Sequence, residues 1–530
     1  MTLKVSVSGA AELAVQNNIE GLVQEKIASR IASKDFTIWG KDAESESAIR
    51  LGWVGSASDS APLVEEIIAL RDKFKAAGVT RFVLCGMGGS SLAPEVITKN
   101  YGVELVVLDS TEPEQVLADV AVDIGRTAIV VSSKSGSTVE TDSQKRIFEQ
   151  AFTNAGIEKT ERIVIVTDPG SPMEAASKAD GYTIFNADPT VGGRYSALTA
   201  FGLVPSGLAG ADIQELLEQA SAAADVLSVD EVSNPGLILG AAMARTQGAG
   251  SFKDKLGIVA SSDIPGFGDW AEQLIAESTG KIGKGILPVV LNSSSVELNG
   301  DQADVLIANV SASQSSIDSH LSVFGSLGAQ FLLWEYATVV ASYLIGVNPF
   351  DQPDVESAKI AARGMLEKRA AIVEPIFISN GIEVRAHNLD LTGVASAEAA
   401  IHAVLAQLKA DGYVSVQAYL NRNGQFASDE LRNAFAKKSA RPTTFGWAPR
   451  FLHSTGQYHK GGPRQGVFVQ LIALSEKDIH VPGRDFTLGQ LIASQAAGDA
   501  QVLADLGRPV LSLTLTNPEV DFANVLKVLS

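Results

Sequence analysis

The sequence is short of cysteine, of histidine and of positive charge, and each shortage narrows the possible chemistry. Cys85 is the only cysteine among 530 residues, which excludes an intrachain disulfide and a cage of thiolate ligands. The six histidines show neither HxH nor HxxxH spacing, so we expect no metal site. Lysine and arginine number 42 against 61 acidic residues, a net charge of −19. Nucleic-acid binding requires a basic face, so we expect no nucleic-acid partner.

Long apolar runs are missing as well. No stretch approaches the roughly 20 apolar residues of a membrane span. The first residues, MTLKVSVSG, lack the basic-then-apolar pattern of a signal peptide. Residues 331–347 come nearest to a span, but Trp334, Glu335 and Tyr336 interrupt them, which indicates a buried helix. We expect no membrane association and a cytoplasmic location.

Four short apolar runs alternate with helix-length segments in the first half of the chain. The runs are RFVLCG (81–86), VELVVLD (103–109), TAIVVSS (127–133) and RIVIVTD (162–168). Such runs are typical of buried parallel strands. Their alternation with helices predicts an α/β fold whose binding loops follow the carboxyl ends of the strands.

The chain is too long for a single hydrophobic core, so we expect several domains. Residues 1–62 are predicted to form a helical segment, and residues 63–245 a first αβ domain. A second αβ domain is expected over residues 246–374, and a C-terminal αβ extension over residues 375–530. No low-complexity linker separates the last two regions, which leaves open whether they share one sheet.

Two of the predicted strands run into turns that are rich in small and hydroxyl-bearing residues. These turns are GMGGSSLAPE (86–95) and SSKSGSTVET (132–141). Glycines let a ligand approach the backbone, and free N–H groups at a helix start attract an anion. The first turn lacks the third glycine of a dinucleotide fingerprint, and neither ends in the GK[ST] of a P-loop. We therefore expect a small phosphate monoester and no cofactor; the alternative is that these serines only cap helices.

Three further segments carry a family resemblance. DPTVGGRYSALTAFGLVP (188–205) has a Gly-Gly-Arg-aromatic-Ser core, AESTGKIGKGILPV (276–289) has Glu-Ser-x-Gly-Lys, and VNPFDQPDVESAK (347–359) has Phe-Asp-Gln before Val-Glu-x-x-Lys. In this order, behind the two turns, they resemble the signatures of the glucose-6-phosphate isomerase family. The resemblance implies two sugar-isomerase (SIS) type three-layer αβα domains with parallel sheets, beside the C-terminal αβ extension.

The resemblance also implies roles for individual residues. Glu277 matches the base that moves a proton between C2 and C1, and Arg194 matches the group that stabilises the anionic intermediate. Gln352 and Lys359 match residues beside the sugar ring and its ring-opening oxygen. Ser135 stands where the family usually has threonine. The residues expected to bind the substrate phosphate are Gly89, Ser90, Ser133, Lys134, Ser135 and Thr138.

Aldose–ketose isomerisation needs these residue types. A carboxylate can move the carbon-bound proton, and an arginine keeps its positive charge beside an enediolate. Each residue also has an ordinary explanation: Glu277 as a helix-terminal carboxylate, Arg194 as an ion-pair partner of Asp188, and Lys359 as a solvated helix residue. Their joint occurrence within the motifs favours catalysis.

The histidine that opens the sugar ring departs from the family's order. The family places it between the glutamate and lysine segments, where this chain has only His320. FLHSTGQYHKGG (451–462) instead resembles the Leu-His-Ser-x-Gly-Gln segment of short bacterial members, which makes His453 the candidate, with His459 as a nearby competitor. Imidazole suits ring opening because it is partly protonated near neutral pH. This order resembles the isomerase portion of transaldolase–isomerase fusion proteins.

The resemblance thus implies a glucose-6-phosphate isomerase, an intramolecular oxidoreductase of glycolysis and gluconeogenesis that acts on a small sugar phosphate as a monomer or homodimer. Two alternatives stay open. One is a phosphoglucose/phosphomannose isomerase of dual specificity. The other is a sugar-phosphate sensor with the same domain type and no catalysis.

Overall fold

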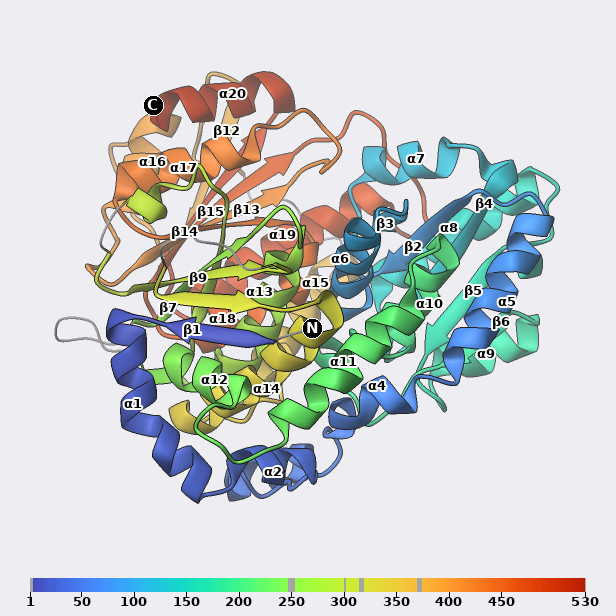
Figure 1. Cartoon of the computed structure of the whole chain (residues 1–530). Coiled ribbons are helices and arrows are strands. Elements are labelled where there is room, and N and C mark those ends of the chain that lie inside the picture. Colours follow the sequence, from blue (N-terminus) through green and yellow to red (C-terminus); the bar gives the residue numbers. More distant parts are fainter. Residues whose placement is uncertain (1–2, 246–252, 300–301, 314–318, 369–373, 530) are drawn as a thin grey trace.

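In the described part of the chain, helices pack around three β-sheets (Figure 1). The computed structural model describes residues 3–245, 253–299, 302–313, 319–368 and 374–529. In Figure 1 the first sheet lies at the right, the second at the lower left and the third at the upper left. None of the described helices combines the length and the apolar run that a membrane crossing requires.

The first sheet carries both hydroxyl-rich turns. Its five strands run parallel in the order β3-β2-β4-β5-β6. The strands are β2 (Arg81–Gly86), β3 (Val106–Leu108), β4 (Thr127–Ser132), β5 (Ile163–Thr167) and β6 (Thr183–Asn186). The helices of this region are α5 (Leu63–Ala76), α6 (Leu92–Tyr101), α7 (Pro113–Ala121), α8 (Val139–Asn154), α9 (Pro172–Asp180) and α10 (Ala200–Ala209). Four of the five strands coincide with the four predicted apolar runs.

The second sheet has the order β1-β10-β9-β7-β8, and only β1 runs antiparallel to its neighbour. The strands are β1 (Lys4–Val7), β7 (Lys255–Ala260), β8 (Leu287–Leu291), β9 (Val305–Ser311) and β10 (Leu321–Phe324). The helices are α11 (Ile213–Leu227), α12 (Pro235–Arg245), α13 (Phe267–Thr279) and α14 (Leu327–Ile345).

The N-terminal segment differs from the helical segment that the sequence predicts. It does form helices, namely α1 (Gly9–Gln24), α2 (Ile27–Ala32), α3 (Glu44–Ser47) and α4 (Ser56–Asp59). Before them, however, Lys4–Val7 pairs with β10, Lys4 opposite Phe324. The alternating pattern of KVSV fits a strand with two different faces, and four residues are too few to reveal it in the sequence.

The third sheet is formed by the C-terminal region alone, so the alternative of one sheet shared with the preceding region is not what the chain adopts. Its order is β11-β12-β16-β15-β13-β14, with β12 antiparallel to both of its neighbours. The strands are β11 (Phe377–Ser379), β12 (Ile382–His387), β13 (Tyr413–Tyr419), β14 (Thr443–Trp447), β15 (Gly466–Ala473) and β16 (Val510–Leu515). The helices are α15 (Pro353–Lys368), α16 (Ala397–Leu405), α17 (Ser428–Ser439), α18 (Gly456–Gly461), α19 (Leu488–Asp505) and α20 (Pro518–Leu529).

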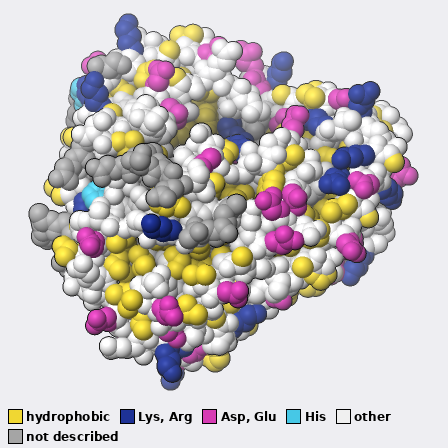
Figure 2. Space-filling view, viewed as in Figure 1, with side chains coloured by type: hydrophobic (Ala, Val, Ile, Leu, Met, Phe, Trp, Pro, Cys, Tyr) yellow, Lys and Arg dark blue, Asp and Glu magenta, His cyan; other side chains and the backbone are white. Residues whose placement is uncertain are grey.

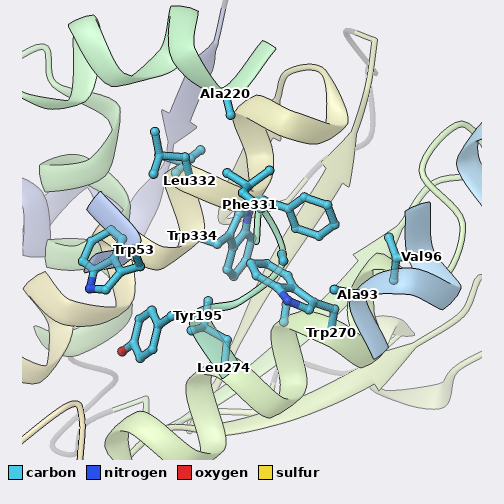
Figure 3. Close-up of a cluster of buried hydrophobic side chains, with 14 of the residues drawn as sticks. Trp53, Ala93, Val96, Tyr195, Ala220, Trp270, Leu274, Phe331, Leu332 and Trp334 are labelled. Atoms are coloured by element: carbon cyan, nitrogen blue, oxygen red, sulfur yellow. The ribbon is translucent and has the colours of Figure 1, made fainter. Parts of the chain in front are cut away.

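One hydrophobic core joins the first and second sheets, and a second core lies within the third sheet and its helices. Two smaller clusters connect the C-terminal region to the first sheet and to the second sheet. Helix α14 is buried over most of its length, which explains why residues 331–347 are so apolar. Figure 3 shows Trp270 of α13 packed against Phe331 and Trp334 of α14. The rings of Trp270 and Phe331 are 4.6 Å apart, edge to face. Aromatic pairs of this geometry add to the free energy of burial, so α13 is held firmly against the core.

The strong negative net charge is not concentrated on one side of the face drawn in Figure 2. Acidic and basic side chains are interspersed there, with hydrophobic ones between them. Any attraction for an anionic substrate must therefore come from a local arrangement of donors and cations.

Candidate functional site

The second hydroxyl-rich turn connects strand β4 of the first sheet to helix α8. Ser133 Oγ lies 3.1 Å from Thr138 Oγ1 and accepts from the N–H of Gly136 at 3.1 Å. Thr138 is the residue that caps α8, yet its side chain makes no capping hydrogen bond. The hydroxyl of Thr138 therefore does not serve the helix end, and it stands beside backbone N–H groups that suit an anion.

Lys134, also in this turn, is directed at a carboxylate. Its Nζ lies 2.6 Å from Asp168 Oδ2, just beyond the end of β5. Burial lowers the pKa of Lys134 and raises the pKa of Asp168, because both charged forms lose water, and their mutual attraction offsets this only in part. The positive charge of Lys134 in this turn is therefore compensated by the carboxylate of Asp168.

The glycines of the first turn bring three segments of backbone together. A Cβ on Gly88, which has φ +56°, would lie 2.7 Å from the carbonyl oxygen of His453. A Cβ on Gly89 would lie 2.0 Å from the carbonyl oxygen of Gly193. Only glycine fits at either place. The first turn, which contains the buried Ser90, is therefore packed against the segments that carry His453 and Arg194.

Arg194 and Glu277 form the centre of the site. Only 3% of the Arg194 side chain and 6% of the Glu277 side chain are exposed, and Arg194 Nη1 lies 3.6 Å from Glu277 Oε2. Arg194 also donates to Ser278 Oγ at 2.9 Å and to Gln352 Oε1 at 2.9 Å. A buried guanidinium with this many acceptors is fixed in orientation. Asp188, the ordinary partner considered from the sequence, accepts instead from Thr190.

Gln273 connects this centre to the histidine segment. It stands one turn before Glu277 on α13, so both side chains leave the same face of the helix. Its Nε2 donates to the carbonyl oxygen of His453 at 2.8 Å and lies 3.5 Å from Glu277 Oε2. One amide group therefore ties the position of the carboxylate to that of the histidine backbone.

His453 lies in the site and is paired with a carboxylate that belongs to the same chain. Its Nε2 is 3.0 Å from Glu140 Oε1, and Gln495 Nε2 donates to the same oxygen at 2.7 Å. Glu140 stands in the first turn of α8, directly after the second turn, and is 5% exposed. A carboxylate held in this way favours the imidazole tautomer that carries its proton on Nε2.

The competing histidines occupy other environments. His459 is 1% exposed and lies 3.0 Å from Tyr413 Oη and 3.3 Å from Ser415 Oγ. Burial lowers the pKa of His459 well below its usual range, so it stays neutral in the core. His320 stands at the start of β10, where its Nδ1 accepts from the N–H of Ile307 at 3.2 Å. Of the three candidates, His453 is the one seated beside the first turn and Gln273.

The structure thus brings most of the predicted site residues together. The two turns, Arg194, Glu277, Gln352 and His453 are linked by the contacts above. The backbone of Lys359 lies in α15, but its side chain is outside the described residues. Cys85 is buried in the first sheet, and burial raises the pKa of its thiol, which fits a packing role. The described residues contain no group of three or more His, Cys, Asp or Glu side chains arranged for a metal ion.

Sequence reasoning missed several residues that complete this arrangement, and the reason is physical. Glu140, Gln273 and Gln495 acquire their partners only through folding: Glu140 and His453 are 313 positions apart. Only Glu140 could have been noticed from its local sequence, because it is an acidic residue at the start of a helix, beside a turn expected to bind an anion. A carboxylate there opposes anion binding unless a cation or an imidazole compensates for it, and this could have prompted a search for a partner.

A comparison with protein families gives a match in the same region. The family model described as phosphoglucose isomerase matches residues 62–237. This stretch contains the first sheet, both turns and Arg194. Glu277, Lys359 and His453 lie outside the matched residues.

Individual relatives extend the match along the chain. A probable glucose-6-phosphate isomerase of Haloarcula marismortui is 35% identical over 210 residues, which are 39% of this chain and 48% of that protein. A glucose-6-phosphate isomerase of a Synechococcus species is 26% identical over 363 residues, which are 56% of this chain and 67% of that protein. The match to the Haloarcula protein therefore spans about half of that relative's length.

Solved structures share the fold. A glucose-6-phosphate isomerase of Chlamydia trachomatis superposes with a TM-score of 0.54 at 17% identity, over 68% of this chain and 87% of that one. A hypothetical protein of Thermus thermophilus gives a TM-score of 0.59 at 24% identity, over 70% of this chain and 100% of that one. The predicted fold class is confirmed: the chain is an α/β protein with parallel-sheet αβα domains of the kind found in phosphosugar isomerases.

Proposed function

We propose that this chain, whose residues 62–237 match the phosphoglucose isomerase family model, interconverts glucose 6-phosphate and fructose 6-phosphate. The observation that carries the proposal is the buried pair of Glu277 and Arg194, whose nearest atoms are 3.6 Å apart. A carboxylate and a fixed cation at this distance can act on adjacent atoms of one small substrate.

In the proposed reaction Glu277 is the base. It takes the proton from C2 of the open-chain aldose and returns it to C1, and the reverse reaction uses the same group. The electron pair left behind forms a cis-enediolate, in which the hydroxyl proton passes from O2 to O1, and Arg194 stabilises its negative charge. An arginine is suited to this task because it stays protonated while the neighbouring carboxylate changes its state. Gln352, which accepts from Arg194, is assigned the contact with the sugar hydroxyls.

Ring opening is assigned to a second group of residues. His453 donates a proton to the ring oxygen as the bond between C1 and that oxygen breaks, and the proton of the C1 hydroxyl passes to water. Glu140 stabilises the charge on the imidazole during this exchange. Lys359 is proposed to assist at the ring oxygen, on the strength of its place in the motif alone. Because Glu140 and His453 lie together within one chain, we propose that each chain supplies its own ring-opening pair.

The substrate phosphate is assigned to the two turns. Ser133, Ser135 and Thr138 provide hydroxyl donors around the start of α8, and Gly89 and Ser90 of the first turn are assigned to the same phosphate. The helix end contributes a favourable field of about 0.3–1 kcal/mol, rising to about 2 kcal/mol where it is partly buried. Binding at the phosphate keeps the substrate in place while its other end changes from ring to open chain.

A coupled assay tests the proposal directly. The protein is given fructose 6-phosphate, and formation of glucose 6-phosphate is followed by its oxidation with a coupling dehydrogenase. Mannose 6-phosphate is assayed in parallel, since its conversion would establish the dual specificity left open by the sequence. A protein that binds these sugar phosphates and converts none of them would be a sensor, and the proposal would be wrong.

A further inference from the structure

Lys281 is a buried cation to which the proposed reaction assigns no task. It follows α13 directly, and only 3% of its side chain is exposed. Its Nζ donates to the carbonyl oxygen of Asn348, to that of Asp351 at 2.6 Å and to Asp351 Oδ1 at 2.7 Å. An ammonium group has three hydrogens, and here each one has an acceptor.

The same loop is bound by Arg194 from the other side. Arg194 Nη2 donates to the carbonyl oxygen of Pro349 and, at 3.1 Å, to that of Asp351. Its Nη1 donates to the side chain of Gln352 at 2.9 Å. Lys281 and Arg194 therefore share one carbonyl oxygen, and the loop over residues 348–352 lies between two cations. Where this loop sits determines where the guanidinium of Arg194 and the amide of Gln352 can be.

We propose that Lys281 is a positioning residue of the isomerase site: it fixes the loop over residues 348–352 and, through that loop, aims Arg194 at the enediolate and Gln352 at the sugar. This inference rests on the proposed function and extends it to a residue that does not itself touch the substrate.

The charges around Lys281 fit this role. Burial, together with the like charge of Arg194, lowers the pKa of Lys281 to about 7, although Asp351 and Glu277 act in the opposite direction. A cation kept at such a cost in hydration is retained for the contacts it makes. A lysine needed only for solubility would lie on the surface.

Lys284 provides a matched control in the same turn. Its Nζ donates to the carbonyl oxygen of Ile345 at 3.0 Å, so it too contacts the connection between α14 and α15. Unlike Lys281 it is exposed, and it contacts neither Asp351 nor Arg194 among the described residues. Lys284→Met therefore removes a lysine of the same turn without touching the proposed hold on the loop.

The experiment compares Lys281→Met with Lys284→Met by steady-state kinetics on fructose 6-phosphate. We expect Lys281→Met to lower kcat about 10²-fold with little change in KM, because a misplaced catalytic group costs rate while the phosphate turns still bind. Lys284→Met should behave like the wild type. Thermal unfolding of both variants shows whether a loss of rate merely reflects loss of fold.

Binding measurements separate this inference from the proposed function. Arabinonate 5-phosphate has a planar carboxylate that resembles the enediolate, whereas glucitol 6-phosphate has none. Calorimetry should show that Lys281→Met loses about 10-fold in affinity for the first and keeps its affinity for the second. Asp351→Ala, at a side chain 38% exposed, should weaken the same preference to a smaller degree.

The outcomes distinguish the two claims. A wild-type protein that converts neither hexose phosphate would contradict the proposed function, and the affinity difference would still report on Lys281. A Lys281→Met protein with wild-type kcat and an undiminished preference for the aldonate would overturn the positioning role alone. So would an unfolded Lys281→Met protein together with an Asp351→Ala protein that matches the wild type in both measurements.

Discussion

The two halves of the site are built from different parts of the molecule. The isomerisation half, centred on Glu277 and Arg194, lies between the first and second sheets, which share one hydrophobic core. The ring-opening half joins Glu140 of the first region to His453 and Gln495 of the C-terminal region, which has its own core. The first half therefore depends on packing within one core, whereas the second depends on the contacts between the first sheet and the C-terminal region.

Ion pairs connect the C-terminal region to the region of the first sheet beside His453. Arg450, three residues before His453, lies 2.6 Å from Asp109 Oδ2 and is also paired with Glu95. Arg422 contacts the same two carboxylates from the C-terminal region. Such mostly buried pairs are specific in geometry, because breaking one leaves a charge without compensation. The position of His453 therefore depends on these ion pairs together with apolar packing, since Phe451 belongs to a buried cluster with Ile492 and Ala496.

The largest effect is expected in the isomerisation half. Glu277→Gln keeps the shape of the side chain but cannot accept a proton, so turnover should fall by about 10²–10⁴-fold on cyclic and acyclic substrates alike. Binding of sugar phosphate should be nearly unchanged. The measurement is exchange of the C2 hydrogen with tritiated water, and exchange at the wild-type rate in this variant would show that another group is the base.

The next largest effect should separate the halves. His453→Ala is expected to slow turnover of cyclic glucose 6-phosphate about 10²-fold, since it removes the acid–base group for ring opening. Turnover of erythrose 4-phosphate, which cannot form the six-membered ring, should stay close to that of the wild type. His320→Ala is the matched control. If His320→Ala shows the selective loss and His453→Ala does not, the assignment of the ring-opening histidine is wrong.

A smaller effect is expected from the partner of His453. Glu140→Gln retains a hydrogen-bond acceptor but loses the charge, and we expect turnover of the cyclic substrate to fall about 10-fold. Glu174 is a matched control, because it also lies in the first turn of a helix of the first sheet and is bonded to Lys178 and to the N–H of Gly170. Equal losses in Glu140→Gln and Glu174→Gln would indicate a general effect on the fold.

The smallest effect concerns the second turn. Ser133→Ala combined with Thr138→Ala should weaken binding of 6-phosphogluconate by roughly 0.5–1.5 kcal/mol per lost hydroxyl contact. Stability should change little, because Thr138 makes no capping bond. Ser171 does cap α9, so Ser171→Ala should cost about 1 kcal/mol of stability and leave binding intact. The reverse pattern would mean that the second turn is a helix cap.

How much the sequence could predict depended on the range of the interactions involved. β2 and β4 coincide almost residue for residue with the apolar runs, because strands buried on both faces carry an unbroken apolar signal. β14 has the sequence TTFGW, with half-buried residues at its exposed edge, and gives no such signal. β1 gives no clear strand pattern in the sequence either, since its pairing with β10 depends on residues more than three hundred positions away.

The site follows the same rule. Arg194 and Glu277 stand in local motifs and could be proposed from the sequence, whereas their mutual distance could not. His453 could be proposed from a short segment, but its carboxylate partner could not, because no local pattern connects Glu140 with a residue of the C-terminal region. Lys281 belongs to a sequence motif, but its proposed role follows only from its contacts with the loop over residues 348–352 in the folded chain.

The most direct test of the account asks whether one chain supplies both halves of the site. Glu277→Gln and His453→Ala are placed in separate chains with different tags, coexpressed, and purified through both tags so that any mixed assembly is recovered. Because His453 lies beside Glu140 and Gln273 of its own chain, each chain remains defective, and the mixture should show no more activity on glucose 6-phosphate than the two variants apart. Recovery of a substantial fraction of wild-type activity in the mixed assembly would mean that the histidine acts across a subunit interface, and would contradict the account.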